Sequence, residues 1–251
     1  MKKTTLFILY ALTVGNVWCD CMSEALYFWP SKNKILENSL IVIDAYGQSQ
    51  ETMLKSDCKA YLVSGTQKIK LNPIEICYGQ FNLTQVILKP ETNLSAGKKY
   101  ELVIDGVENV SHLLNRYNSK TSKYEKIIWE VIDGKDTEVP SWTNLPVYKD
   151  NNYVEYGCGP AVAVNFTFGV EDVSEYLIKA KVNDIKNGTE SSYYLKPDEN
   201  IISIGHGMCS GEFYLEKGTN FEVEFSLMDA SGNAITWEGA PLKFKRPYPK
   251  N

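Results

Sequence analysis

Short apolar runs, most of them alternating with polar residues, recur about every ten residues along the chain. An apolar and aromatic run at 25–29 is ended by Pro30, a run at 40–45 is apolar except for Asp44 and predicts a buried strand, and an alternating run at 58–64 precedes Gly65. The further runs of the first half are residues 68–71, 85–88, 100–104 and 126–132. Alternation bounded by glycine and proline is typical of β-strands, and this spacing predicts an all-β sandwich.

A second set of strands follows a charged stretch at 133–140 that contains one glycine and one proline. Its apolar runs are residues 161–168, 176–182, 201–204, 212–215 and 219–228. Few core contacts are expected to cross such a stretch, so we predict two domains, residues 22–134 and 135–251. The glycine turn and strand at 217–228 repeat the pattern of 97–104, which favours two similar domains.

Two short motifs resemble those of bacterial immunoglobulin-like domains. Leu94-Ser95-Ala96-Gly97-Lys98-Lys99-Tyr100-Glu101-Leu102-Val103-Ile104 resembles their L-x-x-G-x-x-Y-x-L-x-I strand, and Asp229-Ala230-Ser231-Gly232-Asn233 resembles their D-x-x-G-N closing hairpin. The resemblance implies two tandem immunoglobulin-like β-sandwiches, of the kind that serve as spacers, stalks or adhesive units in secreted and surface proteins of bacteria. Bacterial immunoglobulin-like modules usually lack a disulfide. This chain departs from that pattern, because it has two cysteines in glycine-rich turns, Cys158 and Cys209.

The N-terminus has the pattern of a secretory signal peptide. Lys2 and Lys3 precede an apolar run at 6–12 that is too short to span a bilayer. We predict that residues 1–21 are a signal peptide cleaved near Cys19 to Cys21, with lipid attachment there as the alternative. The protein is then secreted, periplasmic or attached to the cell surface. No later run is long and apolar enough for a transmembrane segment.

Export makes disulfides permissible, and the chain has six cysteines. The simplest pairing gives each half one bridge, Cys58 with Cys77 and Cys158 with Cys209. Sequence alone does not fix the connectivity. Cys21 is then left over as a free thiol, an intermolecular link, or a sign that cleavage falls further on.

Charge and motifs exclude several function classes. Lys and Arg total 26 against 31 Asp and Glu, a net charge of -5, without a basic run, so we expect no nucleic-acid partner. The two histidines, His112 and His206, fall in different predicted domains. Residues 207–211 do not form a nucleophile elbow, because the central residue is a cysteine. We predict no enzymatic activity and no cofactor.

Two groups of residues could bind a metal ion instead of forming a disulfide or a hairpin turn. His206 and Met208, with Cys158 and Cys209 if these are reduced, offer ligands that suit copper. Asp229, Ser231 and Asn233 place oxygens at alternating positions, as calcium requires, but a hairpin turn uses the same residues to bond its own backbone. We favour the disulfide and the turn, and therefore predict no metal.

Aromatic residues are the notable surplus, with 16 Tyr and 5 Trp. Tyr148, Tyr153 and Tyr156 gather around a polar stretch at 150–152 that we predict to be a loop. Exposed aromatic rings on a rigid scaffold can stack on sugar rings or anchor a protein partner, although tyrosines also line sandwich edges. The sequence thus predicts a non-enzymatic binding or structural module for an unknown protein or carbohydrate, with these tyrosines and His206 as candidate ligand-binding residues.

Overall fold

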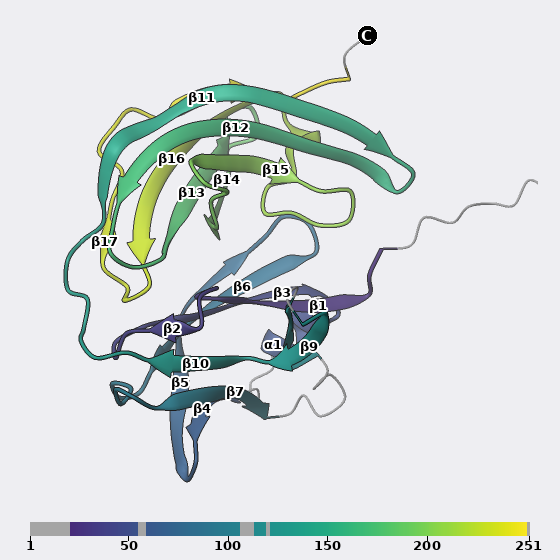
Figure 1. Cartoon of the computed structure of the whole chain (residues 1–251). Helices are drawn as coiled ribbons and strands as arrows, with labels where there is room; N and C mark the ends of the chain where they lie inside the picture. Colours follow the sequence, from purple (N-terminus) through teal and green to yellow (C-terminus); the bar gives the residue numbers. More distant parts are fainter. Residues whose placement is uncertain (1–20, 55–58, 106–112, 119–120, 250–251) are drawn as a thin grey trace, which may run out of the picture.

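The computed structural model describes residues 21–54, 59–105, 113–118 and 121–249, and strands make up most of it (Figure 1). The first half contains β1 (Glu24–Trp29), β2 (Lys34–Ile35), β3 (Ile41–Gly47), the short helix α1 (Ser49–Leu54), β4 (Lys59–Ser64), β5 (Gln67–Tyr78), β6 (Leu83–Pro90), β7 (Lys99–Asp105), β8 (Asn115–Asn118), β9 (Lys123–Lys126) and β10 (Ile128–Val131). The second half contains β11 (Ser141–Tyr156), β12 (Gly159–Glu171), β13 (Tyr176–Asp184), β14 (Thr189–Leu195), β15 (Ile201–His206), the 3₁₀ helix η2 (Leu215–Lys217), β16 (Asn220–Asp229), β17 (Ala234–Ile235) and β18 (Leu242–Lys245). The predicted all-β fold is confirmed.

The first half is built on one eight-stranded sheet with the order β1-β3-β6-β5-β4-β7-β10-β2. Ile43 of β3 shares a buried cluster with Leu102 of β7 and Trp129 of β10, so the sheet folds over and encloses a core of its own. Val42 and Ile87, from the same strands β3 and β6, belong to a second core on the opposite face. Two buried faces explain why β3 is largely apolar rather than alternating, with Asp44 as its one charged residue.

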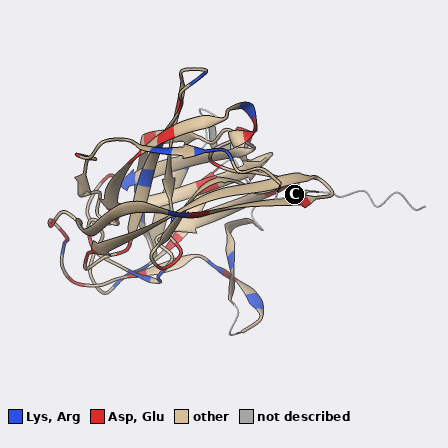
Figure 2. Ribbon diagram, turned by 90° about the horizontal axis from the view of Figure 1, so that it is seen from above, with Lys and Arg blue, Asp and Glu red and all other residues tan. Residues whose placement is uncertain are grey.

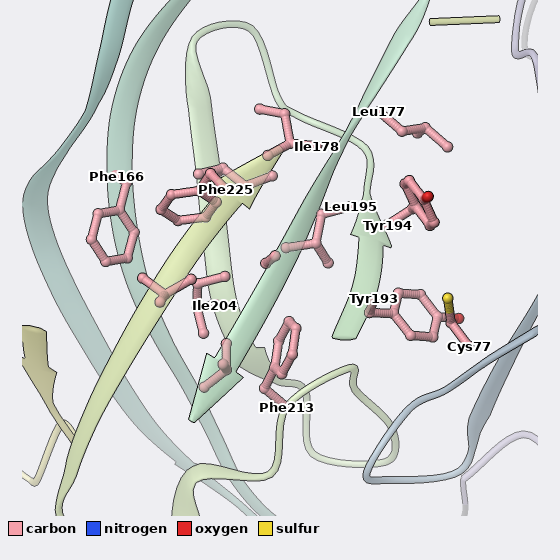
Figure 3. Close-up of a cluster of buried hydrophobic side chains, with 14 of the residues drawn as sticks. Cys77, Phe166, Leu177, Ile178, Tyr193, Tyr194, Leu195, Ile204, Phe213 and Phe225 are labelled. Carbon is pink, nitrogen blue, oxygen red and sulfur yellow. The ribbon is translucent and has the colours of Figure 1, made fainter. Parts of the chain in front are cut away.

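The second half packs two sheets face to face, β11-β12-β15 against β14-β13-β16-β17, with β18 also paired to β16. The alternation predicted at 161–168 places Val164 and Phe166 of β12 in the core (Figure 3). The Phe166 ring lies 5.2 Å from Phe225 and 6.0 Å from Phe244, measured between ring centroids. These aromatic contacts fill the space between the sheets.

The strands separate where the sequence predicts a boundary, since β10 ends at Val131 and β11 begins at Ser141. One buried cluster nevertheless contains Val42 and Ile87 of the first half together with Ile178 of the second. Hydrogen bonds also cross this junction, because Phe81 and Gly211 exchange backbone bonds of 3.1 and 2.8 Å. The division into two domains, and their immunoglobulin-like character, remain predictions.

Further side chains hold the junction together. The Lys179 ammonium lies 2.5 Å from Glu75 Oε1, and the same Glu75 accepts a hydrogen bond from the Tyr194 hydroxyl at 2.9 Å. Ser31 donates its backbone N–H and hydroxyl to Glu175 Oε2 at 3.0 and 2.5 Å. On the face seen in Figure 2, basic and acidic residues are interspersed and neither sign dominates.

Candidate binding groove between the two halves

A groove of about 850 Å³ opens at the junction of the two halves. One wall is strand β1, the opposite wall is the β8–β9 hairpin, and the floor includes Val42 and Asp44 of β3 and Gln85 of β6. Leu177 of β13 and Tyr194 of β14 close it from the second half. A concave, mostly apolar site with a few convergent polar groups is the usual form of a ligand site.

Tyrosine rings dominate the entrance. Tyr27 and Tyr117 are each 53% exposed, and Tyr124 is 73% exposed. Tyr117 and Tyr124 are a cross-strand pair of the hairpin, with their ring centroids 5.3 Å apart. Trp29 is only 5% exposed and lines the groove more deeply, and its indole N–H has no hydrogen-bond partner among the described residues.

The polar floor centres on Asp44. Its Oδ1 accepts hydrogen bonds from the Tyr193 hydroxyl at 2.6 Å and from Gln85 Nε2 at 3.0 Å. The Gln85 amide is fixed in turn by the backbone of Tyr194, with bonds of 2.9 and 3.2 Å. Burial of the carboxyl raises the pKa of Asp44 to about 6, although both hydrogen bonds oppose the rise.

Arg116 attaches the hairpin to the end of β1. Its guanidinium donates to the carbonyl oxygens of Ser31, Pro30 and Phe28 at 2.7, 3.3 and 3.4 Å. These bonds occupy the donors that face β1, so Arg116 positions the wall of the groove. Lys196 is exposed at the rim, and no anionic partner for its ammonium exists among the described residues.

The raised pKa of Asp44 predicts a pH dependence of stability. Because the folded pKa of about 6 exceeds the ordinary 3.8, the folded state binds more protons between these values, and the free energy of unfolding falls as pH rises from about 4 to about 6. Asp44→Asn keeps the Oδ1 acceptor for Tyr193 and Gln85 but cannot ionise. We expect it to be more stable than the wild type at pH 8, by up to about 3 kcal/mol. Urea unfolding at pH 4 and pH 8 measures this difference.

The exposed Asp198 provides the control, since Asp198→Asn is expected to leave the pH profile unchanged. Part of the slope should persist in Asp44→Asn, because burial also raises the pKa of Glu212 to about 7. Parallel pH profiles for the wild type and Asp44→Asn would contradict a buried, ionising Asp44.

The tyrosines predicted to form a binding loop lie in a strand instead. β11 runs through residues 141–156 and pairs with β12 along most of its length. A register shift between Tyr148 and Asp150 leaves Tyr148 opposite Phe166 and Tyr153 opposite Val162, so both point to the core side. Tyr156 falls on the other face, because side chains alternate along a strand. The three rings therefore do not form one platform.

His206 lies in the same cross-strand row as Tyr153 and Val162, at the end of β15. The imidazole is buried, its Nδ1 lies 2.9 Å from the Gly207 carbonyl, and its Nε2 has no partner in the described part of the chain. The ring packs near Tyr214 at 4.8 Å and Phe81 at 6.0 Å. Among the described residues, His206 is not part of any cluster of three possible metal ligands.

The cysteine pairing differs from the prediction. Cys209 is bonded to Cys21 rather than to Cys158, and Cys158 is itself disulfide-bonded, but to neither of these two. The three sulfur atoms lie within 4.8 Å of one another, so the prediction that Cys158 and Cys209 come together is right and only the pairing is wrong. Cys21, just before β1, lies against Cys209, just after β15, and no local sequence pattern indicates this contact.

Cys77 is a free, buried thiol, which contradicts its predicted bridge; Cys58 lies outside the described residues. Cys77 faces the junction core near Tyr193 (Figure 3), away from any other described cysteine, and burial raises the pKa of its thiol to about 12. Cys21 can form this bridge in the mature protein only if the predicted signal peptide is cleaved before residue 21.

Asp229 makes the backbone hydrogen bonds that the predicted hairpin turn requires. Asp229 Oδ1 accepts the backbone N–H groups of Ser231 and Asn233, both at 2.8 Å, and the Asn233 amide donates to Oδ2 at 2.7 Å. Carboxylate oxygens of Asp136 and Asp172 lie within 4.8 Å of Asp229, and Ser174 Oγ bonds to both at 2.6 and 3.0 Å. This cluster serves as part of the junction.

Sequence reasoning missed the residues that line the groove. In the sequence Tyr27 is only one member of an apolar run, and the stretch from Asn115 to Lys123 is mostly polar. The available signal was the alternation of Asn115-Arg116-Tyr117-Asn118 and Lys123-Tyr124-Glu125-Lys126, which matches two strands of a hairpin. No local pattern indicates that this hairpin lies beside β1.

No protein-family model matches the chain, and no curated protein matches it. Several solved structures are similar in part, all at low identity. A pullulanase from Anoxybacillus sp. LM18-11, complexed with maltotriose, is 7% identical over 83% of this chain, with a TM-score of 0.25. A type I pullulanase from Bacillus subtilis str. 168, complexed with maltose, is 8% identical over 90% of the chain, also with a TM-score of 0.25.

The FN1–FN3 domains of chicken CNTN1 are 8% identical over 88% of this chain and 64% of theirs, with a TM-score of 0.24. The chain spans only 24% and 25% of the two pullulanase chains. Within the described residues, no helix has the length and apolar character needed to cross a membrane. The solved structures that are similar in part thus include carbohydrate-active enzymes and fibronectin domains.

Proposed function

We propose that the chain is an exported, non-enzymatic binding module that consists of two immunoglobulin-like sandwiches and binds its ligand in the groove between them. The observation that carries the proposal is the groove itself, about 850 Å³ in volume and lined by tyrosines from both halves. A purely structural spacer has no use for three exposed tyrosines around one hollow, since such rings are normally buried or scattered singly.

The chemistry of the lining supports binding rather than catalysis. None of the described residues that line the groove is a histidine or a cysteine. A thiol nucleophile is activated by a lowered pKa, whereas the Cys77 thiol is buried in the junction core and burial raises its pKa.

Two features support export. Lys2 and Lys3 precede an apolar run at 6–12, and a charged segment followed by a short apolar segment is the pattern of a signal peptide. The Cys21–Cys209 bridge fits an oxidising compartment, because such bonds persist outside the reducing cytosol. We place the protein in the periplasm, at the cell surface or in the medium.

Binding in the groove is testable by NMR, with the Trp29 indole N–H as the reporter. A library of small aromatic and hydroxylated fragments should contain members that shift this resonance. Tyr117→Ala/Tyr124→Ala is expected to weaken their binding by about tenfold, since each aromatic contact contributes about 0.5–1.5 kcal/mol. The matched control is Tyr148→Ala/Tyr156→Ala, two half-exposed tyrosines outside the groove, which should leave binding unchanged.

Fragments that shift resonances of β11 and leave the Trp29 indole unmoved would contradict the proposal in favour of the originally predicted tyrosines. A library that produces no shift at either place would indicate a structural module.

A further inference from the structure

Resting on the proposed function, we infer that the groove binds a neutral carbohydrate, with Tyr27, Tyr117 and Tyr124 stacking on sugar rings and with Trp29 and Asp44 bonding to hydroxyl groups. The groove has room for several sugar units, as its volume lies within the usual range of ligand pockets. The reasons are the exposed ring faces, the unpaired polar atoms of the floor and the balance of charge.

The exposed tyrosine rings of the groove suit the apolar faces of sugar rings. Tyr27 projects from β1, while Tyr117 and Tyr124 project from the hairpin opposite, so the tyrosines line the groove from two sides. A sugar presents an apolar C–H face together with polar edges, and an amphipathic tyrosine ring matches that combination. The planes of the Tyr117 and Tyr124 rings are tilted by 60° to each other, so the two ring faces point in different directions.

The floor offers one unpaired donor and one unpaired acceptor. The Trp29 indole N–H has no hydrogen-bond partner among the described residues, although only 5% of Trp29 is exposed. Both hydrogen bonds to Asp44 reach Oδ1, which leaves Oδ2 without a bond from the described chain. A hydroxyl group both donates and accepts, so one class of group satisfies both atoms. A hydrocarbon chain would leave both unsatisfied, at about 1–3 kcal/mol each.

The charges of the lining favour a neutral ligand. Glu24 and Asp44 are acidic, and Arg116 and Lys196 are basic, so the formal charges cancel. The Arg116 donors that reach β1 are already bonded to three carbonyl oxygens. The lining therefore has no excess of one sign to attract an anion or a cation.

The edge of β1 disfavours an extended peptide. Strand addition needs free N–H and C=O groups on alternate residues of the edge. The Phe28 carbonyl, which points away from β3, already accepts a bond from Arg116. The Arg116 guanidinium thus already occupies one of the edge acceptors that an added strand would use.

The test measures binding of five neutral hexasaccharides by NMR and calorimetry: maltohexaose, cellohexaose, xylohexaose, mannohexaose and chitohexaose. At least one is expected to bind and to shift the Trp29 indole N–H. Tyr124→Ala should weaken that binding by about three- to tenfold. Trp29→Phe, which keeps a ring but removes the donor, should weaken it by a similar factor. Tyr156→Ala, on β11, should change it by less than twofold.

Two further probes separate this inference from the proposed function. If dodecanoate or an alternating valine–threonine hexapeptide shifts the Trp29 indole while none of the hexasaccharides binds, the carbohydrate class is wrong and the groove remains a binding site. If a hexasaccharide binds equally well to Tyr124→Ala and Trp29→Phe, the sugar site lies elsewhere. If no probe and no fragment binds, the inference and the proposed function both fall. Matching melting temperatures for the variants exclude misfolding as the cause of lost binding.

Discussion

Replacing Cys21 and Cys209 together by serine is expected to lower the free energy of unfolding by about 2–5 kcal/mol, the largest effect of any double variant described here. Their bridge joins residues 188 positions apart, and loop-entropy arguments assign the greatest stabilisation to the longest closed loops. It also anchors the start of β1 to the second half. Guanidinium unfolding under non-reducing conditions measures the loss.

The control for this variant is Cys77→Ala, which removes a buried sulfur without breaking a bridge. Its expected cost of about 1 kcal/mol is that of a small cavity in the junction core. A peptide map of the unreduced protein checks the pairing directly. A fragment in which Cys209 is linked to Cys158 would contradict the structure and restore the pairing predicted from the sequence.

Phe166→Ala is expected to lower the free energy of unfolding by about 3–5 kcal/mol. The Phe166 side chain is fully buried and its ring contacts those of Phe225, Phe244 and Tyr148, so alanine leaves a cavity among large, rigid groups. Chemical unfolding followed by fluorescence measures the change. Tyr156→Ala, which truncates a half-exposed ring on the outer face of β11, should cost less than about 0.5 kcal/mol.

The same experiment tests whether the halves unfold together. Phe166 belongs to the core that crosses the junction, whereas Trp129 belongs to the enclosed core of the first half. If the shared core couples the halves, Phe166→Ala should shift the unfolding midpoint reported by Trp129 and by Trp142 equally. Two separate transitions would instead support independent domains.

The sequence allowed the strands to be predicted wherever alternation and turn residues agree. The runs at 58–64, 161–168 and 176–182 became β4, β12 and β13 with small changes of boundary. The stretch at 150–152 was misleading, because Asp and Asn favour turns. Pairing with β12 overrides that preference, and an exposed edge strand tolerates polar residues on both faces.

The groove could not be predicted in the same way. Tyr27 lies about 90 residues from Tyr117 in the chain, and Lys196 comes from the other half, so the site exists only once the halves are packed. The cysteine pairing failed for a related reason. Cys209 has five possible partners among the other cysteines, and no local sequence pattern indicates that the start of β1 brings Cys21 to it.

Among the described residues the halves are joined covalently through residues 132–140 and through the Cys21–Cys209 bridge; in Figure 1 the segment between β10 and β11 runs at the left, whereas the chain enters β1 at the right. A body fastened at two separated points cannot swing open like a hinge. The two halves are therefore expected to keep their relative position whether or not the groove is occupied, and a ligand does not have to draw them together as it enters. Affinity in such a rigid receptor depends on the fit of the ligand rather than on the closing of the protein.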